Sequence, residues 1–221
     1  MIMPDLSKKY EHENNFYLSC DNARIGKLIA HYELYKMVLD IPGQIVEAGV
    51  FKGASFARFA AFRTLLETNF SKKIIGFDMF GEFPETDYEL DKNYRENFIN
   101  TAGSKSISED QLLEILDYKK CNDNIELIAG NILTTVPKYI EENPNLKISL
   151  LHIDVDIYEP TVVLLENLYP LLSKGGVLIL DDYGFFPGET KAVDEYFKGK
   201  DVEIRKFPFS HTPAYIIKNN F

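Results

Sequence analysis

The chain alternates short apolar runs with longer amphipathic segments from about residue 45 onward. Most of these runs are continuously apolar, as expected of strands buried on both faces of a parallel sheet. We expect strands at Ile45–Val50, Lys73–Met79, Ile125–Ala129, Ile148–Ile153, Val177–Leu180, Val202–Ile204 and Ala214–Ile217. We expect helices between them at Ala54–Leu66, Ile132–Glu141, Thr161–Leu172 and Thr190–Phe197. This order predicts an α/β fold with a mostly parallel seven-stranded sheet, helices on both faces and an antiparallel last strand.

Two segments lie outside this alternation. Residues 1–43 include a helical stretch that ends at Pro42-Gly43, so we expect an N-terminal helical extension there. Residues 81–124 are much longer than one connecting helix requires, and insertions of this length are usually lids or binding loops. Within the insertion, Ser108 and Gln111 have the spacing of a capping box before a helix at Glu109–Leu116. We interpret residues 1–221 as a single domain with these two additions.

Charge and cysteine content exclude several classes of function. The chain has 24 Lys and Arg against 34 Asp and Glu, a formal net charge of −10. This balance argues against nucleic acid as a partner, because phosphate binding needs a basic surface, and it leaves a cationic ligand or metal ion open. No apolar run is long enough for a membrane helix, the N-terminus lacks a signal-peptide core, and Cys20 and Cys121 make no disulfide framework. We therefore expect a cytoplasmic protein without membrane contact.

The first expected strand runs into a glycine-containing turn before a helix. Gly49 and Gly53 allow a tight turn and close approach of the backbone to a ligand. The spacing fits neither the dinucleotide-binding fingerprint nor the phosphate-binding loop, and a purely structural turn is the alternative. Together with Glu47 and Ser55, the turn resembles the ExGxxxGxS first motif of class I S-adenosylmethionine (AdoMet) methyltransferases. The resemblance implies that Glu47, Gly49, Phe51, Gly53 and Ser55 bind the cofactor.

Polar residues also follow the second and third expected strands. The carboxyl ends of parallel strands line the ligand crevice of open α/β sheets. Asp78, which ends the second strand, is placed to accept both ribose hydroxyls of a nucleoside. Gly130 and Asn131 follow the third strand, where adenine contacts usually lie in such folds. A helix N-cap is an equally good interpretation of Asn131, and both roles are compatible.

Acidic residues end the fourth and fifth expected strands. Asp154 ends one, and Asp181 and Asp182 end the other. Because adjacent parallel strands are about 4.8 Å apart, we expect these three carboxylates to converge. Such a group repels itself unless a cation lies within it, and oxygen ligands of this kind suit Mg²⁺. The alternative is that these acids cap helices or face water.

At this point the sequence resembles a known family. The stretches IDVDIYEPT and LYPLLSKGGVLILDDYG are similar to motifs of the macrocin O-methyltransferase (TylF-like) family, and the likeness extends from about Ile45 to Phe197. It implies a Rossmann-like class I methyltransferase fold with AdoMet and Mg²⁺ as cofactors. It further implies methylation of a hydroxyl on a deoxysugar, nucleotide sugar or glycoside. A homodimer is also implied, for which the N-terminal helix is the candidate interface.

The resemblance also implies residue roles. Asp154, Asp181 and Asp182 would hold Mg²⁺, and Asp154 would also contact the cofactor and act as the catalytic base. Asp156 is the second choice for the base: we expect its side chain to point to the opposite face from Asp154 if the strand continues, which favours a structural role at the helix start. The catechol-type metal-dependent methyltransferases carry a lysine where this chain has Ile157, which excludes a lysine base at that position.

Three other functions remain open. The acceptor could be a catechol-like small molecule or an amine, because no sequence rule decodes the insertion. The protein could bind AdoMet without catalysis, although a binding relic has no need of three repelling acids. A nicotinamide-dependent dehydrogenase is disfavoured by the missing GxGxxG.

Overall fold

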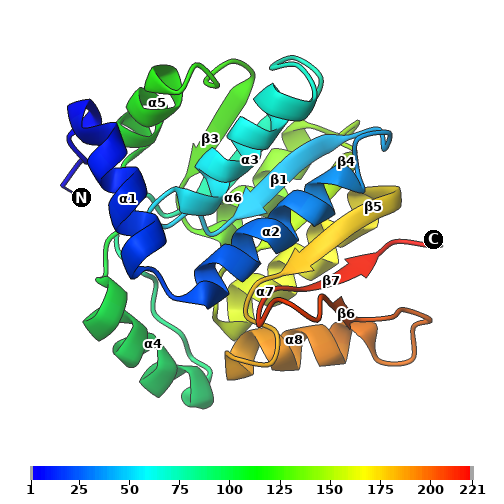
Figure 1. Cartoon of the computed structure of the whole chain (residues 1–221). Coiled ribbons are helices and arrows are strands. Elements are labelled where there is room, and N and C mark those ends of the chain that lie inside the picture. The colour runs from blue at the N-terminus through cyan, green and yellow to red at the C-terminus, as the bar shows by residue number, and fades with distance from the viewer. Residues whose placement is uncertain (1, 220–221) are drawn as a thin grey trace.

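The computed structural model describes residues 2–219 and contains one seven-stranded sheet in the order β3-β2-β1-β4-β5-β7-β6 (Figure 1). The strands are β1 (Gln44–Ala48), β2 (Ile74–Asp78), β3 (Ile125–Ala129), β4 (Ile148–Ile153), β5 (Leu172–Leu180), β6 (Arg205–Lys206) and β7 (Ala214–Ile217). The first five pair in parallel, whereas β7 is antiparallel to both β5 and β6. This confirms the predicted fold class, including the antiparallel last strand.

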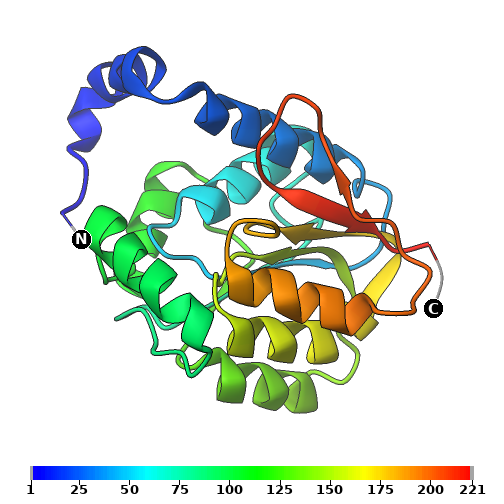
Figure 2. The same cartoon turned by 90° about the horizontal axis from the view of Figure 1, so that it is seen from below.

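Helices cover both faces of the sheet, as Figure 2 shows. One face carries α2 (Asn22–Lys36), α3 (Ala54–Leu66) and α5 (Glu109–Tyr118), and the other carries α6 (Ile132–Glu142), α7 (Tyr158–Asn167) and α8 (Pro187–Phe197). Two further helices, α1 (Lys9–Ser19) and α4 (Glu89–Ala102), and the 3₁₀ turns Leu6–Lys8 and Tyr169–Leu171 complete the described chain.

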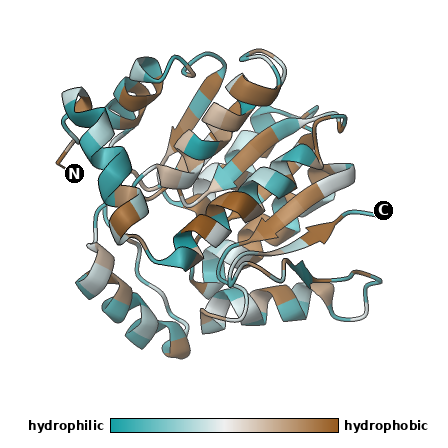
Figure 3. Cartoon of the chain, in the orientation of Figure 1, coloured by the Kyte–Doolittle hydropathy of each residue, from teal (hydrophilic) through white to brown (hydrophobic). Residues whose placement is uncertain are grey.

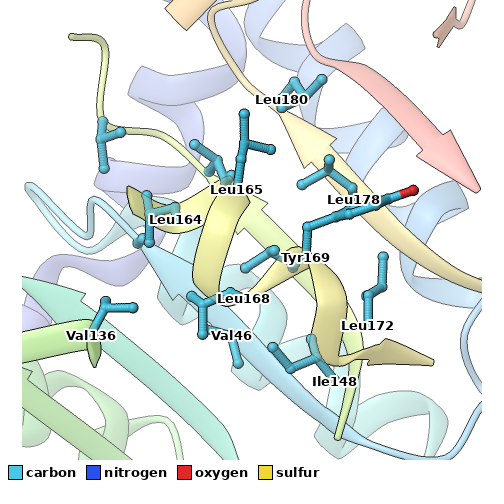
Figure 4. Packing of buried hydrophobic residues seen from close by; sticks show 14 of the residues in the cluster. Val46, Val136, Ile148, Leu164, Leu165, Leu168, Tyr169, Leu172, Leu178 and Leu180 are labelled. Carbon is cyan, nitrogen blue, oxygen red and sulfur yellow. The ribbon is translucent and has the colours of Figure 1, made fainter. Parts of the chain in front are cut away.

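Strand β5 explains why the apolar runs are continuous. Val177 and Ile179 pack into the core beneath α2 and α3, while Leu178 and Leu180 pack into the core beneath α7 and α8. All four side chains are fully buried, because successive side chains of a strand point to opposite faces and both faces are covered. Figure 3 shows the hydrophobic colour along this strand, and Figure 4 shows Leu178 and Leu180 packing near Leu165 of α7.

The structure corrects the sequence at several elements, including β5, which begins at Leu172 and not at Val177, and α8, which begins at Pro187 and not at Thr190. Helix α4 in the insertion was not expected, because its polar sequence gives a weak apolar pattern and only Asp91 is buried in it. Helix α7 begins at Tyr158 and not at Thr161, since proline is tolerated in a first helical turn. The sixth strand is Arg205–Lys206, a short exposed edge strand, and not Val202–Ile204. The capping box of Ser108 and Gln111 is confirmed at the start of α5.

The strand order reverses between β1 and β4: β2 and β3 follow outward from β1 on one side, and β5 follows outward from β4 on the other. In open α/β sheets such a switch point leaves a crevice outside the carboxyl ends of the two strands. Backbone hydrogen bonds continue past the strand ends, from Asp154 N to Ala48 O (2.9 Å) and from Asp181 N to Ile153 O (3.0 Å). The acidic ends of β4 and β5 are therefore held beside the turn that follows β1.

The N-terminal helix α1 differs from the other helices. Each of its residues is exposed, including Tyr17 and Leu18, and Figure 1 shows it running along the outside between α2 and α5. Across residues 2–219, the helices are either too short or too polar to cross a bilayer.

Candidate active site

A cavity of about 880 Å³ opens at the carboxyl edge of the sheet. Its lining includes eight of the residues expected from the sequence at a cofactor or metal: Gly49, Phe51, Ser55, Asp78, Asn131, Asp154, Asp181 and Asp182. Three other residues that the sequence places at the cofactor are not among the described residues that line the cavity: Glu47, Gly53 and Gly130. The volume is at the upper end of typical ligand pockets, which suits two substrates together.

The turn after β1 forms one wall of the cavity. Gly49 has φ +91°, and a Cβ there would lie 1.6 Å from the carbonyl oxygen of Asp154. Glycine is therefore required for the close approach of β1 to the end of β4. Glu47 is fully buried behind this wall, and its carboxylate accepts a hydrogen bond from Ser55 Oγ at 2.7 Å. The turn after β1 thus packs against the end of β4, and the bond between Ser55 and Glu47 links β1 to the first turn of α3.

Asp78 and Asn131 lie at the ends of β2 and β3. The Asp78 carboxylate accepts hydrogen bonds from the backbone N–H of Phe51 (2.9 Å) and of Phe80 (2.6 Å), which fixes its orientation. Each carboxylate oxygen keeps capacity for a further donor from a ligand. Asn131 caps α6 by accepting from Leu133 N at 2.9 Å and also lines the cavity. Its role as a helix N-cap and its expected place at the cofactor are therefore compatible in this structure.

Three carboxylates meet at the floor of the cavity. Ligand atoms of Asp154, Asp156 and Asp182 all lie within 4.8 Å of one another. The expectation that Asp156 faces away from Asp154 is wrong, because residues two apart in a strand point to the same face and not to opposite faces. In the structure β4 ends at Ile153 and the backbone turns through a left-handed Asp156 with φ +63°, and the Asp156 carboxylate lies close to that of Asp154.

Burial and mutual repulsion dominate the electrostatics of this group. Burial and the Asp181 carboxylate raise the pKa of Asp154 to about 7. Burial, together with neighbouring carboxylates, raises the pKa of Asp156 and of Asp182 well above the usual range. Glu189 of α8 lies beneath them, fully buried, and accepts from Asp182 N at 3.0 Å. Burial and Asp182 also raise the pKa of Glu189.

Asp181 has the opposite environment. Its carboxylate receives the ammonium group of Lys27 from α2, and His152 Nε2 lies 3.3 Å from its other oxygen. These partners outweigh burial and hold the pKa of Asp181 well below its usual range. Burial would lower the pKa of His152, but Asp181 and Glu47 outweigh it and raise it to about 10. Asp181 is therefore a neutralised carboxylate, although it lies next to Asp182 in the sequence.

A second group of metal-ligating types consists of His31, His152 and Asp181, with His31 Nε2 at 3.7 Å from Asp181. The Arg58 guanidinium donates to His31 Nδ1 at 3.0 Å, because arginine is a donor only. The proton of neutral His31 is consequently on Nε2, the atom that faces Asp181, and burial lowers the pKa of His31 to about 3. We interpret this group as cationic and N–H groups gathered around the Asp181 carboxylate, and not as a metal site.

The Asp154, Asp156 and Asp182 group fits a hard divalent cation. Carboxylate oxygens are the ligands that Mg²⁺ prefers, and burial and mutual repulsion outweigh the nearby Lys27 in raising the pKa values of Asp154 and Asp182. Compared with the sequence prediction, the structure keeps Asp154 and Asp182 together, adds Asp156, and engages Asp181 elsewhere.

Sequence reasoning missed Lys27 and Glu189. Lys27 lies on a helix remote in sequence from the other residues, so no local motif marks it. Glu189 is one of several acids in a polar helix start, and only its full burial distinguishes it.

Comparisons with known proteins show which proteins this chain resembles. The family model for macrocin-O-methyltransferase (TylF) matches residues 22–208. The chain is 27% identical over 165 residues to a demethyldecarbamoylnovobiocin O-methyltransferase of Streptomyces niveus, covering 74% of this chain and 61% of the relative. It is 31% identical over 149 residues to 8-demethyl-8-(2,3-dimethoxy-alpha-L-rhamnosyl)-tetracenomycin-C 4'-O-methyltransferase of Streptomyces olivaceus, covering 65% of this chain and 54% of the relative. The chain thus spans little more than half the length of these curated relatives.

Among solved structures, the crystal structure of the calicheamicin methyltransferase CalS11 is similar, with a TM-score of 0.80 and 30% sequence identity. The match covers 96% of this chain and 86% of that chain. The likeness therefore extends over nearly all of this chain.

Proposed function

Because the chain belongs to the macrocin-O-methyltransferase (TylF) family, we propose that it transfers the methyl group of AdoMet to a hydroxyl of a sugar. The observation that carries the proposal is the group of Asp154, Asp156 and Asp182 at the floor of a cavity beside the turn after β1. An acidic, uncompensated floor has little use in a binding module but suits a hydroxyl that must lose a proton.

AdoMet would bind along the turn after β1. Gly49 allows its close approach, Asp78 would accept the ribose hydroxyls, and Asn131 would lie near the adenine. Glu47 would influence the cofactor site indirectly, by accepting the hydrogen bond from Ser55 that holds the start of α3. Phe51, Gly53 and Gly130, which all have positive φ, would shape the backbone around the cofactor.

The magnesium ion would be held by Asp154 and Asp182, which belong both to the expected set and to the group that the structure gathers. The third ligand is Asp156 in the present arrangement, or Asp181 if Lys27 releases it. When bound, the ion would supply positive charge that favours ionisation of the acceptor hydroxyl.

The chain's own residues would move the proton. We assign the base to Asp154, because its carboxylate lines the cavity within the acidic group beside the turn after β1. Asp156 is the alternative base, because its carboxylate lies in the same group. Loss of methyl transfer in Asp154→Asn but not in Asp156→Asn would support the first assignment, and the reverse pattern the second.

The acceptor would lie between the aspartates and the insertion. Phe83, Phe98, Phe185 and Phe186 line the cavity there, and apolar faces of sugar rings pack well on aromatic side chains. The names of the two curated relatives support a glycosylated natural product as acceptor.

The test is methyl transfer from labelled AdoMet to a panel of deoxysugars, nucleotide sugars, glycosides and catechols, with mass spectrometry of the products. We expect a methylated sugar, and activity that EDTA abolishes and Mg²⁺ restores. Transfer to catechols alone would support the catechol alternative. AdoMet binding without transfer to any acceptor would support a non-catalytic protein.

We also propose a homodimer that covers α1. An 11-residue helix with no buried residue gains little from packing within its own chain, and Tyr17 and Leu18 are 61% and 86% exposed. Light scattering of the protein and of the Leu18→Glu variant tests this: a dimer that becomes a monomer supports the interface, and a monomeric wild type refutes it.

A further inference from the structure

Asp91 of α4 is fully buried, and it bonds to two other helices. One carboxylate oxygen accepts from Tyr158 N at 2.9 Å, and the other accepts from Gly188 N at 2.7 Å. Both N–H groups belong to first helical turns, of α7 and of α8, which have no partner within their own helices. A single carboxylate from the insertion therefore caps two helices of the main fold.

These two helices follow the segments that carry the catalytic acids. Asp154 and Asp156 lie just before α7, and Asp182 lies just before α8. Gly188 permits this contact, because a Cβ at that position would lie 1.9 Å from Asp91 Oδ2. Asp91 thus fixes the start of α7 relative to the start of α8, and with them the two acidic segments.

A second contact runs in the opposite direction. Glu159, in the first turn of α7, accepts from the backbone N–H groups of Asp87 (2.9 Å) and Tyr88 (3.0 Å) and from Thr86 Oγ1 (2.9 Å). These donors lie at the start of α4. Each helix therefore carries an acid that caps the other, and Figure 2 shows α4 beside the starts of α7 and α8.

We propose that Asp91 and Glu159 form a reciprocal clamp that couples the insertion over the cavity to the spacing of the carboxylates. Both are positioning residues. Asp91 holds Asp154 and Asp156 at the correct distance from Asp182, while Glu159 holds residues 86–88 over the acceptor side. The inference rests on the proposed function for the identity of the cation, whereas the clamp itself rests on the hydrogen bonds of Asp91 and Glu159.

The first test is titration calorimetry of Mg²⁺ alone and of AdoMet alone with Asp91→Asn. The amide keeps one oxygen acceptor but turns an N–H₂ group toward the other helix start, so one cap is lost while shape is retained. We expect Mg²⁺ affinity to fall at least tenfold and AdoMet affinity to change less than threefold. Unchanged Mg²⁺ affinity in a folded variant would overturn the proposal.

The matched control is Ser108→Ala, which removes the capping box of α5 in the same insertion without touching α7 or α8. We expect a similar loss of thermal stability with unchanged Mg²⁺ affinity. If this variant weakens Mg²⁺ binding as much as Asp91→Asn does, the effect is a general loss of stability and the clamp is refuted.

A second variant attacks the clamp from the other side. Gly188→Ala leaves the sequence of the insertion intact, but its Cβ would lie 1.9 Å from Asp91 Oδ2 and 2.5 Å from Tyr158 N, so it disturbs the contact between Asp91 and the starts of both helices. If both changes break the same clamp, the loss of Mg²⁺ affinity in the double variant Asp91→Asn/Gly188→Ala is less than the sum of the two single losses, whereas additive losses would contradict a shared contact.

Failure of the proposed function is distinguishable from failure of the clamp. If the wild-type protein binds no Mg²⁺, the proposed metal chemistry fails, and the clamp is then tested by amide hydrogen exchange. We expect Asp91→Asn to speed exchange at the starts of both α7 and α8 at least tenfold. Faster exchange at only one of the helices, or at neither, would overturn the clamp.

Discussion

Asp181 and Asp182 are adjacent in the sequence, yet they belong to two different electrostatic regions. Asp181 faces α2, where Lys27 and His152 neutralise it, whereas Asp182 faces Asp154 and Asp156, whose carboxylates and burial outweigh the more distant Lys27. The pKa of Asp181 is lowered although burial alone would raise it. The pKa of Asp182 is raised by burial and by the neighbouring carboxylates. The comparison teaches that a charged residue at the end of a strand acquires its role from the side on which its carboxylate lies.

The largest effect is expected in the uncompensated region. Asp154→Asn should lower the rate of methyl transfer about 10³-fold, because it removes both a metal ligand and the assigned base. Single-turnover transfer from labelled AdoMet measures this, with AdoMet affinity as the control. A rate within tenfold of wild type would show that Asp154 has neither role.

The compensated region should respond in stability. Lys27→Met leaves Asp181 buried with only its histidine partners, and breaking a buried pair costs about 3 kcal/mol of unfolding free energy. Urea unfolding without metal measures the loss. Lys36→Met, which breaks an exposed ion pair with Glu33 on the same helix, is the control and should leave stability unchanged. Equal stability of the two variants would contradict the pairing of Lys27 with Asp181.

The same region should also make stability depend on pH. The pKa of His152 is about 10 in the folded chain and near 6.5 when unperturbed, so the folded state binds its proton more tightly. The resulting stabilisation is complete below pH 6.5 and is lost as the pH rises through about 10. Between about pH 7 and 9 the unfolding free energy should fall by up to about 1.4 kcal/mol per pH unit.

Urea unfolding across this pH range, compared with His152→Gln, tests the assignment. The variant has no imidazole to titrate, so its unfolding free energy should decline less steeply with pH than that of the wild type. Parallel declines in the two proteins would show that His152 is not charged in the fold.

The smallest effect is expected at Glu47, whose carboxylate lies 3.6 Å from His152 Nδ1. Ser55→Ala removes the hydroxyl that donates to the Glu47 carboxylate, and one such hydrogen bond contributes about 1 kcal/mol to stability. Thr101→Ala, which removes an exposed hydroxyl bonded to Asn97 O, serves as the control. Thermal unfolding should separate the two variants, and identical melting curves would remove Ser55 from the network.

Much of the fold could be predicted from the sequence, because its signals are local. Helix α3 begins and ends as expected at Ala54 and Leu66, and the buried strands were found from their apolar runs. Helix α4 could not be found this way, since it is held by Asp91 and by the cap from Glu159, both long-range contacts. The sequence likewise placed Asp154, Asp181 and Asp182 at one edge of the sheet, but not the direction of each carboxylate.

The sequence by itself determined the class of fold, the turn at Gly49 and the family, because each depends on residue types at fixed local spacing. Only the tertiary structure decided that Lys27 neutralises Asp181, that Asp156 joins Asp154 and Asp182, and that Asp91 caps both helices behind them. The physical reason is that burial and charge act through space. Residues far apart in the chain set each other's protonation and orientation once the sheet brings them to one edge.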